Sequence, residues 1–261
     1  MASLGDDLAV RHGNLCITPE GRSVESVFLG DHQAEPKHRV AITCRHHCCE
    51  MMTNYTMEGL IRWVLYTTEV KAEWLRQQVE FFLGPFVDKN GDQGKGRQPR
   101  DLGRDYEGNS LSASTQTIRR QLPVSANGRL RMGLDLHCLW ISGEHNEVVY
   151  LVGAEDCRNV NEQRRFSTIL ESVNQGLFPF SRHDFLPFGR SWNTQGNYSQ
   201  GKGSAQWITG LPNLTLGSFI EIPYANAGGV EVNQVSARSF GEDLGRTIAV
   251  YLQELPQNQC Q

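Results

Sequence analysis

The organisation of the chain is set by residues 39–50, which read RVAITCRHHCCE. Residues 39–44 form a short, mostly apolar run with several β-branched side chains, a pattern typical of a buried strand. Over residues 50–66 the apolar side chains recur at roughly helical spacing. The sequence therefore predicts a strand that runs through a polar turn at residues 45–50 into a helix.

This turn carries a candidate pair of metal ligands. Glu50 follows both His46 and His47, and either histidine could share a cation with it. Catalytic zinc takes three protein ligands and leaves one position open, so a third ligand is required. His137 supplies it, because it lies at the end of a predicted strand and strand ends form ligand crevices in open α/β sheets. Asp135 points to the same side of that strand and is a candidate hydrogen-bond partner of His137.

Strands and helices alternate along the rest of the chain, which indicates the α/β class. Further strands are predicted over residues 131–140, 147–153 and 214–224, and further helices over 70–83 and 240–255. Residues 88–109 form a long glycine-rich loop, and the irregular residues 189–203 are a candidate lid. Because no linker divides the chain, we expect a single domain over residues 1–261.

The composition excludes several classes of protein. The 261 residues are 39% hydrophobic and 21% charged, enough for one well-filled core. The net charge of −4 offers no general attraction for nucleic acid or for an anionic membrane. No apolar run approaches the roughly 20 residues that a membrane helix needs. Residues 1–7 lack the features of a secretory signal, so we expect a cytoplasmic protein.

The seven cysteines favour the same compartment. Cys48 and Cys49 are neighbours, and their placement with the others does not resemble a disulfide framework. With these two between candidate ligands and Cys138 directly after the third, oxidation should disturb the site.

Four motifs occur in order along the chain: RHHCCE (45–50), DLGRDY (101–106), DLH (135–137) and FIEIPY (219–224). Together they resemble the zinc metallocarboxypeptidases, in particular a bacterial-type branch with a loop like residues 91–97 ahead of its Asp-x-x-Arg-Asp-Tyr segment. The resemblance covers residues 21–252. It implies a mixed, twisted sheet of about eight strands with helices on both faces. The stretch before the first ligand is short for that family, so the first elements of the sheet carry no prediction.

The resemblance also implies roles for individual residues. His47, Glu50 and His137 would bind zinc. Glu221 would be the general base, and its place in an apolar strand agrees with this, because a buried carboxylate is costly unless it is paired or functional.

Two arginines and a tyrosine complete the site that the resemblance implies. Arg104 would polarise the scissile carbonyl, Arg97 would bind the substrate carboxylate, and Tyr198 is a candidate for the tyrosine that closes over the substrate. The residue before Arg104 is usually asparagine in that family and helps to hold the terminal carboxylate, whereas this chain has Gly103.

The expected function is that of a zinc metallocarboxypeptidase that hydrolyses a C-terminal peptide or amide bond by metal-activated water. Its substrate would be a peptide or amide with an anionic terminus. Gly103 leaves open a zinc amidohydrolase that deacylates acylated amino acids. A third hypothesis is an inactive metal-binding relative that serves as a binding module, although an inactive protein would not need Glu221.

Overall fold

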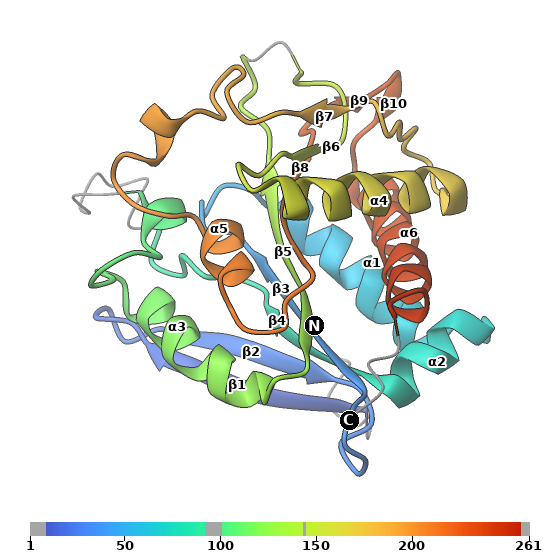
Figure 1. The fold of residues 1–261 in the computed structure, drawn as a ribbon, viewed down its shortest axis with the longest axis horizontal. Coiled ribbons are helices and arrows are strands. Elements are labelled where there is room, and N and C mark those ends of the chain that lie inside the picture. Colours follow the sequence, from blue (N-terminus) through green and yellow to red (C-terminus); the bar gives the residue numbers. More distant parts are fainter. Residues whose placement is uncertain (1–8, 92–100, 143–144, 257–261) are drawn as a thin grey trace.

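The computed structural model describes residues 9–91, 101–142 and 145–256. A mixed sheet of eight strands crosses the molecule, in the order β1-β2-β4-β3-β5-β8-β6-β7 (Figure 1). The strands are β1 (Val10–Ile17), β2 (Ser23–Leu29), β3 (His38–Cys44), β4 (Val79–Gly84), β5 (Leu130–Cys138), β6 (Tyr150–Val152), β7 (Phe185–Leu186) and β8 (Leu216–Ile222). This confirms the expected fold class.

The four central strands, β4, β3, β5 and β8, are parallel, and β2 and β6 flank them in the antiparallel sense. The carboxyl ends of β3, β5 and β8 therefore lie together at one edge of the sheet. The register pairs His137 of β5 with Glu221 of β8. Paired residues on neighbouring strands point to the same face, so the topology brings two predicted site residues side by side.

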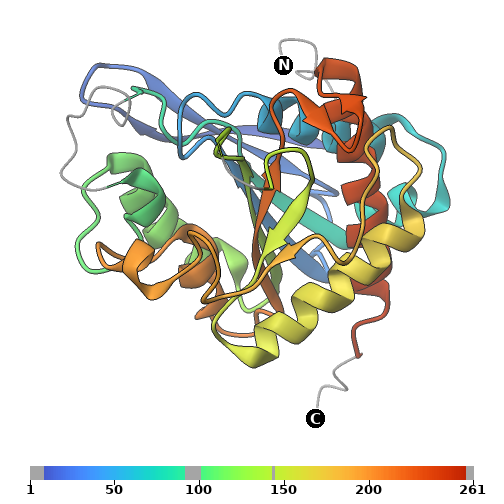
Figure 2. The same ribbon diagram turned by 90° about the horizontal axis from the view of Figure 1, so that it is seen from above.

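Helices cover both faces of the sheet (Figure 2). The helices are α1 (Met52–Tyr66), α2 (Val70–Gln78), α3 (Ala113–Ala126), α4 (Cys157–Val173), α5 (Ser204–Thr209) and α6 (Gln234–Gln253). The larger core lies between the sheet and α1, α2, α4 and α6, and a smaller core lies under α3 and α5. Alternate residues of the central strands serve the two cores: Val40 and Phe81 lie in the first, and Ala41 and Phe82 in the second.

Helices α1 and α6 approach each other at two glycines. A Cβ on Gly59 would lie 2.0 Å from the carbonyl oxygen of Arg238, and one on Gly241 would lie 2.0 Å from that of Thr56. Only residues without a side chain permit these backbone contacts. Through them α6 is fixed against α1, the helix that begins just after Glu50.

One predicted element is partly wrong. The helix expected over residues 70–83 ends at Gln78, and residues 79–84 form β4 in the centre of the sheet. Phe81 and Phe82 are both buried, on opposite faces of the strand. A helix would expose part of such a run, whereas a central strand covered on both faces buries all of it.

Smaller elements complete the described chain. Two 3₁₀ turns, η2 (Leu102–Arg104) and η3 (Gln195–Tyr198), lie in the predicted loops, and β9 (Asn226–Ala227) pairs with β10 (Val230–Glu231). No helix within the described residues has the length and apolar character needed to cross a bilayer.

Candidate metal centre

A cleft of about 800 Å³ opens at the carboxyl ends of β3, β5 and β8. Its lining includes six of the predicted site residues, namely His47, Glu50, Arg104, His137, Tyr198 and Glu221. The seventh, Arg97, lies outside the described residues. Five separate segments of the chain thus bring the predicted residues to one place.

The turn after β3 orients the first two candidate ligands. Arg45 adopts a left-handed conformation, with φ of 57°, and its guanidinium donates a hydrogen bond to the carbonyl oxygen of Cys48. The backbone N–H of Glu50 donates to the carbonyl oxygen of His47 at 3.1 Å. This tight turn brings Nδ1 of His47 within 2.7 Å of Glu50 Oε1.

His137 closes the group from β5. Its Nδ1 lies 3.1 Å from Glu50 Oε2. The Nδ1 atoms of both histidines thus face the two oxygens of one buried carboxylate. Burial raises the pKa of Glu50, but the neighbouring His137 and His47 outweigh this effect and lower the pKa, so the carboxylate is ionised.

This arrangement fits a zinc ion. Glu50 Oε2 is buried and accepts no hydrogen bond; the group beside it, at 3.1 Å, is Nδ1 of His137, itself a candidate ligand. A buried carboxylate oxygen in this position is costly unless a cation compensates it. Two imidazoles and one carboxylate match the ligand set of catalytic zinc sites that keep an open position. The open side of such a site would be the cleft, since all three residues line it.

Asp101 orients His47 by contacting Nε2, the ring nitrogen that faces away from Glu50. Its Oδ1 lies 3.2 Å from His47 Nε2 and accepts a hydrogen bond from the backbone N–H of Gly103 at 2.7 Å. When Nε2 donates to this carboxylate, Nδ1 is left available as a ligand. A Cβ on Gly103 would lie 3.0 Å from His47 Nε2. No role was predicted for Asp101 from the sequence, although this residue opens the DLGRDY motif.

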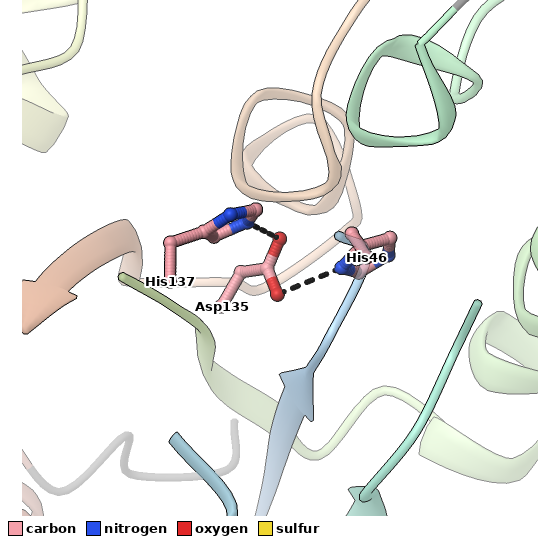
Figure 3. A group of neighbouring side chains, drawn as sticks. All are labelled: His46, Asp135 and His137. Carbon is pink, nitrogen blue, oxygen red and sulfur yellow. Dashed lines mark hydrogen bonds and ion pairs between the residues drawn. The ribbon is translucent and has the colours of Figure 1, made fainter. Parts of the chain in front are cut away.

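Asp135 plays the corresponding part for His137, as predicted. Its Oδ2 lies 2.8 Å from His137 Nε2, and its Oδ1 lies 2.9 Å from Nδ1 of His46 (Figure 3). Nε2 of His46 lies 2.7 Å from the hydroxyl of Tyr106. Ser204 and Thr43 also donate to the Asp135 carboxylate.

His46, Asp135 and His137 form a second group whose geometry could hold a metal ion. Three observations favour the group of His47, Glu50 and His137. Both oxygens of Asp135 already accept hydrogen bonds from outside the group, one from Thr43 and one from Ser204. Neither His46 nor Asp135 lines the cleft. The second group also lacks an orphaned oxygen like that of Glu50 among the described atoms.

Glu221 lies beside the candidate ligands, at the end of β8. Burial raises its pKa to about 7, with the positive charge of His137 acting in the opposite direction. A carboxylate with a pKa near neutrality can both take up and release a proton. The side chain lines the cleft while remaining 7% exposed.

Arg104 and Tyr198 meet on one part of the cleft. The guanidinium carbon of Arg104 lies 4.6 Å from the centre of the Tyr198 ring, and Nε donates to the carbonyl oxygen of Asn197 at 3.1 Å. The Tyr198 hydroxyl donates to Oδ1 of Asn193 at 3.0 Å. These contacts hold the arginine in place, with Arg104 only 9% exposed.

Three cysteines line the same cleft: Cys48, Cys49 and Cys138. The six cysteines of the described residues are free thiols. This agrees with the absence of a disulfide framework from the sequence pattern. None of the three belongs to either group of candidate ligands.

The architecture is that of the metallo-carboxypeptidases. A metallo-carboxypeptidase from Burkholderia cenocepacia is 17% identical, with a TM-score of 0.75, and the match covers 95% of this chain and 66% of that one. A putative carboxypeptidase A from Shewanella denitrificans OS-217 is 18% identical, with a TM-score of 0.71 and coverage of 95% and 66%.

A metallo-carboxypeptidase from Pseudomonas aeruginosa, in complex with (2-guanidinoethylmercapto)succinic acid, is 18% identical, with a TM-score of 0.65 and coverage of 94% and 65%. The chain thus spans slightly less than two thirds of the length of these three structures. No protein-family model matches the sequence, and no curated protein matches it. At these identities the comparison establishes the shared fold.

Proposed function

We propose that this protein is a zinc-dependent hydrolase of the metallocarboxypeptidase type, which cleaves the C-terminal amide bond of a peptide. The observation that carries the proposal is the meeting of His47, Glu50 and His137 in a cleft that Glu221 also lines. A metal ligand set beside a carboxylate of raised pKa is what hydrolysis by activated water requires.

His47, Glu50 and His137 would hold the zinc ion, which when bound would acidify a water molecule and polarise a carbonyl. Glu221 would accept the proton of the attacking water and pass it to the leaving amine. Arg104, fixed by Asn197 and Tyr198, would offset the negative charge that develops on the carbonyl oxygen, an effect typically worth about 3 kcal/mol for one donor.

The anionic terminus of the substrate would be bound by arginine, because a guanidinium contacts a carboxylate through two hydrogen bonds. We propose that Arg97 binds the terminal carboxylate of the substrate. Tyr198 would take part through Arg104, since its ring supports the guanidinium and its hydroxyl is already bonded to Asn193.

A second candidate is deacylation of an acylated amino acid. It is favoured by Gly103, which presents no side-chain amide to a terminal carboxylate. Its backbone lies against the His47 ring, where a Cβ would already be within 3.0 Å of Nε2. Both candidates share the same machinery and an amide substrate with a carboxylate, so one assay can separate them.

The test is to incubate a mixed peptide library with zinc-loaded protein and follow the products by mass spectrometry, beside Glu221→Gln. We expect the parent protein to remove C-terminal residues and Glu221→Gln to lose at least about 100-fold of that activity, as general-base catalysis contributes 10²–10⁴-fold. Glu155→Gln, at an exposed position, is the matched control and should behave as the parent does.

Two outcomes would count against the peptidase. Cleavage of N-acyl amino acids without cleavage of any peptide would favour the deacylase. Undiminished activity in Glu221→Gln would contradict the mechanism for both candidates.

A further inference from the structure

A second groove lies between α3, residues 108–110 and the segment at the end of α5. The two helices are neighbours on one face of the sheet, over the smaller core (Figure 1). The volume of this α3–α5 groove is about 620 Å³, within the range of sites that bind small molecules. None of its described lining residues also lines the cleft of the metal centre. A molecule bound in the α3–α5 groove would therefore not occupy the cleft.

The α3–α5 groove carries positive charge. Arg119 and Arg120, consecutive residues of α3, both line it, and among the described residues no acidic side chain does so. Helix α3 contains no acidic residue that could neutralise them. The carboxylate of Asp105 is already bonded to backbone N–H groups just before α3, and Glu107 forms an ion pair with Lys202. In a chain of net charge −4, this local excess of positive charge favours an anionic ligand.

Arg119 is held in place by the loop that borders the groove. Its Nη1 donates to the carbonyl oxygen of Gly108 at 2.6 Å and to the hydroxyl of Ser110 at 2.8 Å. Nε and Nη2 form no hydrogen bond within the described chain, so this edge of the guanidinium remains available. Such an edge contacts a phosphate through two parallel hydrogen bonds. Arg120, which is exposed, places a second guanidinium beside it.

Another part of the lining is apolar. It consists of Trp207, Leu211 and Pro123. Trp207 is half-buried, and its ring centre lies 5.4 Å from that of Tyr106, so the indole is packed in position. A flat ring bound there would bury area against the indole, and nucleobases of any sequence stack on such side chains.

Amide side chains add polar groups suited to the edge of a base. Asn109 and Gln116 both line the groove. Nε2 of Gln116 donates to the carbonyl oxygen of Ser110 at 2.7 Å, which fixes the side chain and leaves its own oxygen as an acceptor. Asparagine and glutamine side chains form hydrogen bonds with the edge of adenine in particular.

We propose that the α3–α5 groove binds a nucleoside monophosphate, with the phosphate on Arg119 and Arg120 and the base against Trp207. An inorganic anion would leave the apolar part of the lining uncovered, and an uncharged ring would leave both arginines without a partner. A strand of nucleic acid is disfavoured, because two arginines neutralise few phosphates and affinity depends on that number. The site is separate from the proposed hydrolase and does not depend on it.

Calorimetric titration of the zinc-loaded full chain with AMP, with adenosine and with inorganic phosphate tests the proposal. We expect AMP to bind at least about tenfold more tightly than either of its parts, because the guanidinium contacts and the stacking act together. None of these titrations requires turnover, so the result is independent of whether the protein cleaves a peptide.

Variants of the lining locate the bound AMP. Arg120→Gln should weaken AMP binding about tenfold through the loss of a charge-assisted contact and leave adenosine binding unchanged. Trp207→Ala should weaken AMP and adenosine binding alike, about tenfold, through the loss of stacking. Trp207→Phe keeps a ring against Tyr106 and should retain most of the affinity. Arg158→Gln, at an exposed position of α4, is the matched control and should bind AMP as the parent does.

The same titrations contain the results that would overturn the site. One is an AMP affinity that is the same in the parent, Arg119→Gln and Arg120→Gln, as binding at the zinc ion would give. Another is an AMP affinity no greater than that of inorganic phosphate, or no binding of AMP at millimolar concentration. A single-stranded oligoadenylate that binds more tightly than AMP, and loses affinity in Arg120→Gln, would replace the mononucleotide by nucleic acid as the ligand.

Discussion

Asp135 positions the candidate ligand His137, and it also contacts His46. Burial raises the pKa of this carboxyl, but His46 and His137 outweigh burial and hold the pKa well below its usual range. As an ionised carboxylate it accepts from His137 Nε2 and so directs Nδ1 of the same ring towards Glu50. His46, held in turn by the Tyr106 hydroxyl, fixes the carboxylate from its other side.

We therefore expect Asp135→Asn to weaken zinc binding by about 10- to 100-fold, because removing the partner of a ligating histidine costs this much. Tyr106→Phe should act in the same direction and more weakly, since it reaches His137 through two intervening groups. Zinc affinity can be measured by competition with a chromophoric chelator.

Tyr251→Phe is the matched control for Tyr106→Phe. Like that of Tyr106, its hydroxyl forms a side-chain hydrogen bond, here by donating to Oε2 of Glu162 at 2.6 Å, between helices α4 and α6 and away from the cleft. Both variants lose a buried tyrosine hydrogen bond, so similar losses of stability are expected. Equal zinc affinities in the two variants would contradict the positioning role of Tyr106.

At the scale of single residues, the candidate ligands could be predicted from the sequence, but not all of the side chains that orient them. His47, Glu50 and His137 could be predicted because each lies at a strand end or a helix start with a recognisable motif. The role of Asp101 could not be predicted because its hydrogen bond to His47 joins residues 54 positions apart in the chain. Tyr106 and His46 are 60 positions apart, and only the fold brings them together.

At the scale of the element, the contact between α1 and α6 depends on two glycines. A methyl group at Gly241 would lie 2.0 Å from the carbonyl oxygen of Thr56 and 2.7 Å from the backbone nitrogen of Leu60. Neither neighbour is a side chain that can rotate away. One helix must shift, and α1 begins just after the candidate ligand Glu50.

We expect Gly241→Ala to lower the free energy of unfolding by about 1–3 kcal/mol, the usual cost of overpacking. Thermal unfolding followed by circular dichroism measures this change. Gly196→Ala is the control, because the nearest atom to its Cβ would lie 3.8 Å away. A Gly241→Ala protein as stable as the parent would show that the helices separate without cost.

Elements differed in how well the sequence predicted them. β3, β5 and β8 were found because they are buried on both faces and read as apolar runs. The predicted helix over residues 70–83 includes most of β4, because short apolar runs do not distinguish a buried helix from a central strand. Residues 79–84 form a strand because they pair with β3. This pairing joins distant segments of the chain, so no local sequence pattern reveals it.

At the scale of the whole molecule, the parallel centre of the sheet does most to create the site. The carboxyl ends of β3, β5 and β8 lie at one edge, so His47, His137 and Glu221 meet although they lie far apart in the sequence. Helices on both faces supply the rest: α1 begins beside Glu50, and the segments leading to α3 and α5 bring Arg104 and Tyr198. The α/β class could be predicted from the alternation of strands and helices, and the mixed eight-stranded sheet from the resemblance that the four ordered motifs carry.

The most direct test of the metal centre is anomalous diffraction at the zinc absorption edge from crystals of the zinc-loaded protein. We expect one strong peak among Nδ1 of His47, Nδ1 of His137 and the carboxylate of Glu50, on the side open to the cleft. A peak among His46, Asp135 and Nε2 of His137, or no peak in this region, would contradict it.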